Sequence, residues 1–265
     1  MRVLVVGAGA VGSVLGGLLA KAGHEVTLLG RAWHLDVVRR DGLKISGLWG
    51  EHWIKRCAIV TRPEDVPARP AFDWIFVCVK SPQTAEAASQ LPAWLGPRTL
   101  VCAFQNGLGN YETLLQAVPA ERLALGRVIF GVELAPGHVR VTVFADEVLI
   151  GSPDARFPST QAAALAAALQ ESGIPARATA TILTALWAKV LYNCALNGLS
   201  ALLDVPYGKL LEQPLTKGLM AMVIEEAYRV AAARGIRLEP SDAGAYLELL
   251  FTRLVPDTAG HRSSM

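Results

Sequence analysis

The hydrophobic pattern divides the chain into two parts. Over the first 180 residues, short and wholly apolar runs alternate with stretches of helix-forming residues. Such runs are typical of strands buried on both faces, and their alternation with helices predicts a mostly parallel sheet. From Thr181 onward no strand pattern appears, and the remaining stretches predict helices alone. We therefore predict an α/β domain at residues 1–180 and an all-α domain at residues 181–265.

The first apolar run, Arg2 to Val6, leads directly into a glycine-rich turn. The turn matches G-x-G-x-x-G and is followed by a helical stretch and by a second apolar run at residues 25–29. A dinucleotide-binding motif requires this context, because its glycines permit a tight turn, a close approach to pyrophosphate and close helix–strand packing. We predict a Rossmann-type domain, rather than a glycine turn without a ligand. Its expected cofactor contacts are Gly7, Ala8, Gly9, Ala10, Val11 and Gly12.

The end of the second apolar run indicates which dinucleotide binds. NAD-binding proteins usually place an acid there to hold the ribose 2′-hydroxyl. This chain has Gly30 followed by Arg31. A guanidinium can bind a 2′-phosphate through two hydrogen bonds, so we predict NADP(H) as the cofactor. The alternative is that Arg31 is a solvated residue leading into the next helix.

Two later apolar runs end in polar residues. Residues 73–80 predict a buried strand with Lys80 at its carboxyl end, where open parallel sheets bind ligands. Residues 100–104 predict another strand, which leads into Asn106. Asn106 is a candidate for a position over the nicotinamide, although an Asn before Gly is often only a turn residue.

Two segments of the first part predict smaller β-structure. Residues 43–60 carry short alternating pieces separated by glycines, which indicates a β-excursion before the next core strand. Residues 126–151 predict three strands, joined at residues 136–137 and 145–146.

The helical stretch from Thr181 to Asn197 is apolar except along one stripe. Lys189, Asn193 and Asn197 recur every four residues, which places them within roughly 80° of one another on a helix. A buried ammonium beside two amides is unfavourable unless the groups have partners, and a ligand in a cleft would supply them. The alternative is that Lys189 caps a neighbouring helix or pairs with an acid, while the amides bind backbone.

Composition and charge narrow the classes of partner. Lys and Arg number 25 against 23 Asp and Glu, and no run of like charges occurs, so we expect no nucleic-acid partner. No apolar stretch is long enough to span a membrane, and the N-terminus lacks a signal-peptide pattern. Four widely separated cysteines indicate a reducing compartment, so we predict a cytoplasmic protein. The five histidines show no metal-ligand spacing, and we predict no metal.

These motifs together resemble those of the ketopantoate reductase (2-dehydropantoate 2-reductase) family, two-domain enzymes that use NADPH and have a 6-phosphogluconate-dehydrogenase-like fold. The resemblance rests on GAGAVG at 7–12, VK at 79–80, QNGLGN at 105–110, LWAKVLYNCALN at 186–197 and HRSSM at 261–265. It implies reduction of 2-dehydropantoate, a small branched 2-oxo acid, to pantoate on the route to pantothenate and coenzyme A. The cofactor and the acid would share a cleft between the domains.

The resemblance also implies roles for individual residues. Lys189 would be the general acid that protonates the carbonyl oxygen as hydride reaches the adjacent carbon. Arg31 and Lys80 would face the phosphates or ribose of NADPH, and Asn106 would help to position both cofactor and substrate. The implied substrate-binding residues are Asn106, Asn193, Asn197 and Ser264.

The sequence departs from the family pattern at two points. The pattern continues beyond Ser-Ser-Met into a segment with a substrate-binding Glu, whereas this sequence stops at Met265. We expect a chain shorter than the natural protein, the alternative being a site without that carboxylate. Tyr207 stands where some members carry Asn, which leaves the 2-oxo acid open. Reduction of another small 2-oxo acid and a non-catalytic NADP-binding protein remain alternatives, and a homodimer stays open.

Overall fold

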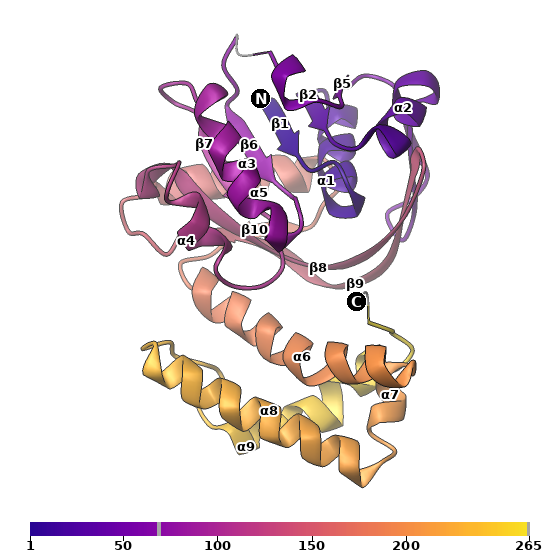
Figure 1. The fold of residues 1–265 in the computed structure, drawn as a ribbon, viewed down its shortest axis with the longest axis vertical. Helices are drawn as coiled ribbons and strands as arrows, with labels where there is room; N and C mark the ends of the chain where they lie inside the picture. The colour runs from indigo at the N-terminus through magenta and orange to yellow at the C-terminus, as the bar shows by residue number, and fades with distance from the viewer. Residues whose placement is uncertain (68–69, 264–265) are drawn as a thin grey trace. The chain divides into compact units, whose positions relative to one another are not determined.

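The computed structural model describes residues 1–67 and 70–263 of the chain. The chain separates into two compact units, Met1–Ile182 and Leu183–Met265 (Figure 1). Each unit has its own hydrophobic core, built in the first from strands and helices and in the second from helices.

The centre of the first unit is a parallel sheet of the dinucleotide-binding type. Along the sheet, the strands follow the order β5 (Ala58–Val60), β2 (Glu25–Leu29), β1 (Arg2–Val6), β6 (Trp74–Val77), β7 (Leu100–Ala103) and β8 (Leu123–Ala135). Each neighbouring pair in this series is parallel. From β1 the chain adds β2 and β5 on one side and then β6, β7 and β8 on the other. The strand order therefore reverses between β1 and β6, which is the point where sheets of this kind bind ligands. The predicted Rossmann-type architecture is confirmed.

The segment at residues 43–60 differs from the prediction. Only β3 (Leu43–Gly47) and β4 (His52–Ile54) form an antiparallel excursion, at the far end of the sheet. β5 instead belongs to the parallel core, where it pairs with β2. Three residues are too few for their hydrophobic pattern to show which strand they will pair with, so the pairing is decided by tertiary contacts.

The predicted three strands at residues 126–151 are two. β8 forms a long antiparallel hairpin with β9 (His138–Gly151), and both curve strongly (Figure 1). The expected turn at residues 145–146 lies inside β9, because Asp146 accepts a hydrogen bond from the buried Arg127 across the ladder. The irregularity that resembled a turn is a shift of register between Arg127 and Ile129. β10 (Ala176–Ala178) adds a parallel strand beside β9.

Helices pack against this sheet. α1, the first after the glycine turn, is buried along most of its length and contacts both β2 and β3. The helices of the unit are α1 (Ala10–Lys21), α2 (Ala32–Asp41), α3 (Thr84–Gln90), α4 (Asn110–Leu114) and α5 (Ser159–Glu171). Short 3₁₀ turns are η1 (Pro63–Asp65), η2 (Ser81–Gln83), η3 (Leu91–Ala93) and η4 (Ala120–Arg122).

All the regular secondary structure described in the second unit is helical, as predicted. Its elements are α6 (Ile182–Leu203), α7 (Tyr207–Leu210), α8 (Pro214–Ala233), α9 (Ala243–Leu249), a π-helical turn η5 (Leu250–Leu254) and η6 (Pro256–Thr258). The core joins Leu191 and Leu196 of α6 to Met220 and Ile224 of α8 and to Leu250. This packing fixes which face of α6 is covered and which is left for polar residues.

Candidate active site

The glycine turn between β1 and α1 forms a close-fitting cradle. Gly7 has φ +97°, and a Cβ there would lie 2.6 Å from the backbone nitrogen of Val79. A Cβ at Gly12 would lie 2.4 Å from the carbonyl oxygen of Gly7. At Gly9, the N-cap of α1, a Cβ would meet no atom of the described residues within 4 Å, so space lies open before the helix N-terminus. The turn therefore fits a pyrophosphate held at close range by backbone.

Electrostatics at this end of α1 also suit an anion. The N–H groups of Gly7 and Ala8 both donate to the carbonyl of Leu29, which ties the turn to the end of β2. The first turn of α1 contains no acidic residue. The partial positive charge of the helix N-terminus is therefore not offset by a carboxylate of that turn.

Gly30, where an acid could have followed β2, packs closely on the glycine turn. A Cβ at Gly30 would lie 3.2 Å from both the nitrogen and the Cβ of Ala8. A carboxylate side chain at this residue would therefore press on the glycine turn. Arg31, the N-cap of α2, is the next residue and is exposed. The role of Arg31 at a 2′-phosphate stays a prediction.

Lys80 and Asn106 lie in neighbouring loops at the carboxyl edge of the sheet. The apolar run predicted a strand that extends to Lys80, but β6 ends at Val77 and Lys80 is the N-cap of η2. Both side chains are exposed. The hydroxyl of Ser81 donates to the carbonyl oxygen of Asn106 at 2.9 Å, which joins the two loops. The loop that carries Lys80 also packs on Gly7, through Val79.

A buried hydrogen-bond network fixes the Asn106 loop, and the sequence reasoning did not find it. The Thr84 hydroxyl lies 2.8 Å from the carbonyl oxygen of Ser81, 2.8 Å from Oδ1 of Asn110 and 2.7 Å from Nε2 of Gln105. The Asn110 amide in turn donates to the carbonyl of Asn106 at 3.0 Å. The sequence signal for this network was in Gln105 and Asn110, the polar ends of QNGLGN, which follow a run of buried apolar residues.

In the second unit, α6 presents its predicted polar stripe. Lys189, Asn193 and Asn197 are each half-buried, whereas Leu191 and Leu196 are fully buried on the core side. The apolar circumference is explained by packing against α8 and the segment around Leu250. The stripe is thus neither core nor a fully solvated face, and its contact with a ligand stays a prediction.

Tyr207 is a second residue that the sequence reasoning left without a role. It is 2% exposed, and its hydroxyl donates to Oδ1 of Asn197 at 2.6 Å. Burial, with a smaller contribution from the neighbouring Tyr192, raises the pKa of Tyr207 to about 12, so the phenol keeps its proton. Its ring lies 5.9 Å from that of Tyr192 and 5.2 Å from that of His261, measured between centroids.

The HRSSM segment returns to the end of α6. The backbone N–H of Tyr207 donates to the carbonyl of His261 at 2.8 Å. Arg262 pairs with Asp204 at 2.7 Å, and the N–H of Ser263 donates to the hydroxyl of Ser200 at 3.2 Å. The predicted site residue Ser264 lies outside the described residues. The described part of the motif is therefore held close to the Tyr207–Asn197 pair.

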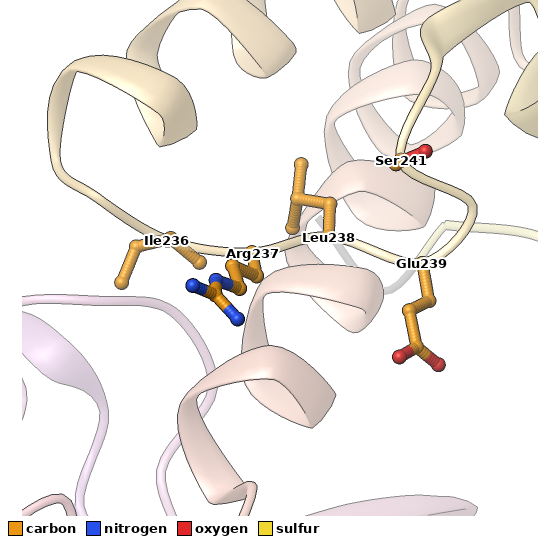
Figure 2. Close-up of a pocket in the computed structure, with 5 residues that line it drawn as sticks. All are labelled: Ile236, Arg237, Leu238, Glu239 and Ser241. Carbon is orange, nitrogen blue, oxygen red and sulfur yellow. The ribbon is translucent and has the colours of Figure 1, made fainter.

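A separate open cavity lies along the loop between α8 and α9. It has a volume of about 550 Å³ and is lined by Ile236, Arg237, Leu238, Glu239 and Ser241 (Figure 2). Leu238 points to the opposite side of the chain from Arg237 and Glu239 and joins the core. The predicted site residues are not among those that line it.

The described residues contain neither a metal-ligating cluster nor a membrane-spanning helix. Within residues 1–67 and 70–263, no three His, Cys, Asp or Glu side chains are grouped so that they could hold a metal ion. Over the same residues, no helix combines the length and apolar character needed to cross a membrane.

Comparisons with known proteins bear on the family of the chain. The family model "Ketopantoate reductase PanE/ApbA" matches residues 3–155, and "Ketopantoate reductase PanE/ApbA C terminal" matches residues 181–265. A 2-dehydropantoate 2-reductase of Aquifex aeolicus is 38% identical over 100% of this chain and 83% of its own length.

Two solved structures share the fold over the whole chain. A PanE/ApbA family ketopantoate reductase from Ralstonia eutropha has a TM-score of 0.86 at 34% identity, covering 100% of this chain and 83% of that one. D-mandelate dehydrogenase with NADH and anilino(oxo)acetate has a TM-score of 0.87 at 28% identity, covering 100% and 84%. On these matches, the chain belongs to the ketopantoate reductase family, whose members are NADP-dependent oxidoreductases that act on CH–OH groups.

Proposed function

We propose that this chain reduces 2-dehydropantoate to pantoate with NADPH, and that Lys189 is the general acid. The observation that carries the proposal is the half-buried stripe of Lys189, Asn193 and Asn197 on an otherwise apolar helix. It occurs in a chain that is 38% identical to a 2-dehydropantoate 2-reductase.

The first unit would hold the cofactor. The turn from Gly7 to Gly12 would take the pyrophosphate, Arg31 the 2′-phosphate, and Lys80 and Asn106 the remaining phosphate, ribose or nicotinamide side. When bound, NADPH supplies the hydride. The Ser81 and Asn110 contacts to the Asn106 carbonyl hold that loop in one geometry, which limits the entropy lost on binding.

The second unit would bind and protonate the 2-oxo acid. Reduction of a ketone develops negative charge on its oxygen, and a positioned ammonium stabilises that charge and donates the proton. General acid catalysis of this kind typically contributes about 10² to 10⁴-fold. The amides of Asn193 and Asn197, with Ser264, would hold the carboxylate and hydroxyl oxygens of the substrate.

The direct test is Lys189→Ala, assayed for 2-dehydropantoate-dependent oxidation of NADPH. We expect kcat to fall about 10² to 10⁴-fold with little change in NADPH affinity, because the lysine acts on the substrate oxygen. Lys209→Ala is the matched control, since Lys209 is an exposed lysine of the same unit that pairs with Glu212. An unchanged kcat in Lys189→Ala would remove this residue from the mechanism.

A second candidate is a reductase of another small 2-oxo acid. The observation that favours this candidate is the similarity to D-mandelate dehydrogenase, which was solved with NADH and anilino(oxo)acetate. A panel containing 2-dehydropantoate and a phenyl-substituted 2-oxo acid decides between the two by their kcat/KM values. A non-catalytic NADP-binding protein would instead bind NADPH and oxidise it with none of these acids.

The biological setting belongs to the same proposal. A role on the route to pantothenate and coenzyme A predicts that the chain restores growth without pantothenate to a bacterium that lacks its own ketopantoate reductase. The described free cysteines, of which Cys102 is buried in the sheet, agree with a reducing, cytoplasmic setting.

We also propose a homodimer, which exposed apolar side chains of α8 support.

A further inference from the structure

We propose that Tyr207 is a positioning residue that orients the amide of Asn197, so that its Nδ2 group faces the substrate as a hydrogen-bond donor. This inference rests on the proposed function, because it assigns the direction of one substrate contact. It adds a residue that lies on α7, outside the Lys189 stripe. The contact would then select an acceptor oxygen of the 2-oxo acid.

The direction of the amide follows from the hydrogen bond itself. A phenol has one proton to donate, and the hydroxyl of Tyr207 donates it to Oδ1 of Asn197 at 2.6 Å. An Asn amide has one accepting and one donating end. With Oδ1 bound to Tyr207, the two N–H donors of Nδ2 are the end of the amide that remains for another partner.

Tyr207 is itself held on several sides. Its ring meets those of Tyr192 and His261, and its N–H donates to the carbonyl of His261. The Tyr192 hydroxyl lies 2.5 Å from that of Thr258, which donates to the carbonyl of Leu254 at 2.8 Å. Reversal of the Asn197 amide would let Nδ2 donate to the phenol oxygen, but it would leave the phenol proton without its present acceptor. A buried donor without a partner is unfavourable, so the hydrogen bond favours the observed orientation.

The consequence is a chemical preference at this point of the site. A carboxylate, keto or hydroxyl oxygen of a 2-oxo acid can accept from Nδ2, whereas a group that only donates cannot. Asn197 would therefore recognise oxygen through a donor whose direction is set before the substrate arrives, which reduces the entropy lost on binding.

The experiment compares Tyr207→Phe with wild type. Tyr207→Phe keeps the ring packing and removes the donor. We expect KM for 2-dehydropantoate to rise about 3- to 10-fold, the equivalent of one neutral hydrogen bond, with kcat and NADPH affinity nearly unchanged. Tyr228→Phe is the matched control, because Tyr228 is another tyrosine of this unit and its hydroxyl donates to the carbonyl of Pro240.

Two further variants test whether Tyr207 acts through Asn197. In an Asn197→Ala background, Tyr207→Phe should have no additional effect on KM, since the two changes remove one unit. Asn197→Asp keeps an acceptor for Tyr207 but replaces the donor with a charged oxygen, so KM should rise by at least about tenfold. Additive effects of the single changes would overturn the inference.

A readout that does not depend on turnover separates this inference from the proposed function. The ¹⁵N side-chain amide resonance of Asn197, assigned through its loss in Asn197→Ala, should shift in Tyr207→Phe and stay unchanged in Tyr228→Phe. If wild type does not oxidise NADPH with 2-dehydropantoate, the proposed function fails while this shift still supports the oriented amide. An unshifted resonance, or an unchanged KM in an active enzyme, overturns the role of Tyr207.

Discussion

Gly9 and Gly12 belong to one turn, yet they lack side chains for different reasons. Gly12 lies against the carbonyl of Gly7, which leaves no room for a Cβ inside the protein itself. Gly9 has φ −88°, which any residue can adopt, and its Cβ position faces open space. We therefore expect Gly9 to be required by the bound cofactor and Gly12 by the fold.

Alanine substitutions should separate these two requirements. Gly12→Ala should lower the free energy of unfolding by about 1–3 kcal/mol through overpacking. Gly9→Ala should leave stability within about 0.5 kcal/mol of wild type. It should nevertheless weaken NADPH binding about tenfold or more, since the methyl group occupies the space of the pyrophosphate. Thermal unfolding without nucleotide measures the stability, and an NADPH fluorescence titration measures the affinity. Equal stability of the two variants would contradict this account.

His34 is a buried neutral base that joins three elements. Its Nε2 lies 3.1 Å from the hydroxyl of Ser13 in α1, and its Nδ1 accepts from the N–H of Gly137 in the β8–β9 hairpin at 3.1 Å. Burial lowers the pKa of His34 below its ordinary value of 6.5, against a smaller opposite effect of the Ala135 carbonyl. Protonation would also remove the acceptor that Gly137 uses.

This lowered pKa makes stability depend on pH. Below the ordinary pKa the unfolded chain binds a proton that the folded chain does not, so the free energy of unfolding falls as pH drops through 6.5. The fall ends once pH passes below the folded pKa. We expect the melting temperature of wild type to decrease over this range more steeply than that of His34→Gln. Parallel pH profiles of the two proteins would show that His34 does not contribute.

At the scale of elements, Thr84 joins α3 to the loop that carries Asn106. Its single hydroxyl is shared among Ser81, Gln105 and Asn110, and it is 2% exposed. Loops at the carboxyl edge of a parallel sheet are usually its more mobile parts. Here the hydrogen bonds, rather than strand pairing, determine the loop geometry.

Thr84→Val retains the shape and removes the hydrogen bonds. We expect it to lower the free energy of unfolding by about 1–3 kcal/mol, because buried polar partners are left unsatisfied. We also expect it to raise KM for NADPH, since the Asn106 loop loses its fixed position. Thr84→Ser restores the hydroxyl and should recover KM even if packing is slightly impaired. A Thr84→Ser variant as defective as Thr84→Val would assign the effect to the methyl group.

At the scale of the whole molecule, α8 carries an exposed apolar stripe. Leu215 is 84% exposed, Leu219 48%, Met222 66% and Val230 47%. Spacings of four, three and eight residues place these side chains on one face, opposite the buried Met220 and Ile224. Exposed apolar side chains gathered on one helix face are common at interaction sites.

The proposed homodimer can be tested on this stripe. Leu219→Glu combined with Met222→Glu should shift the mass measured by light scattering from dimer to monomer, because burying two carboxylates at an interface is unfavourable. Leu48→Glu, a change of an exposed leucine in the first unit, should leave the mass unchanged. A wild-type protein that stays monomeric at high concentration would refute the dimer itself.

The features that the sequence alone could predict are those with short-range signals. GAGAVG beside its apolar runs indicated the nucleotide turn, and the four-residue spacing of Lys189, Asn193 and Asn197 placed them on one helix stripe. Backbone geometry and helical periodicity are set by residues a few positions apart, so both patterns can be read locally.

The remaining features depended on partners far apart in the chain. β5 could join the core only by pairing with β2, and Asp146 stays within β9 because it bonds Arg127, nineteen positions earlier in the chain. Thr84 meets Gln105 and Tyr207 meets Asn197 through single hydrogen bonds that leave no periodic trace in the sequence. A buried polar group must find some partner, but which one it finds is decided when the elements pack.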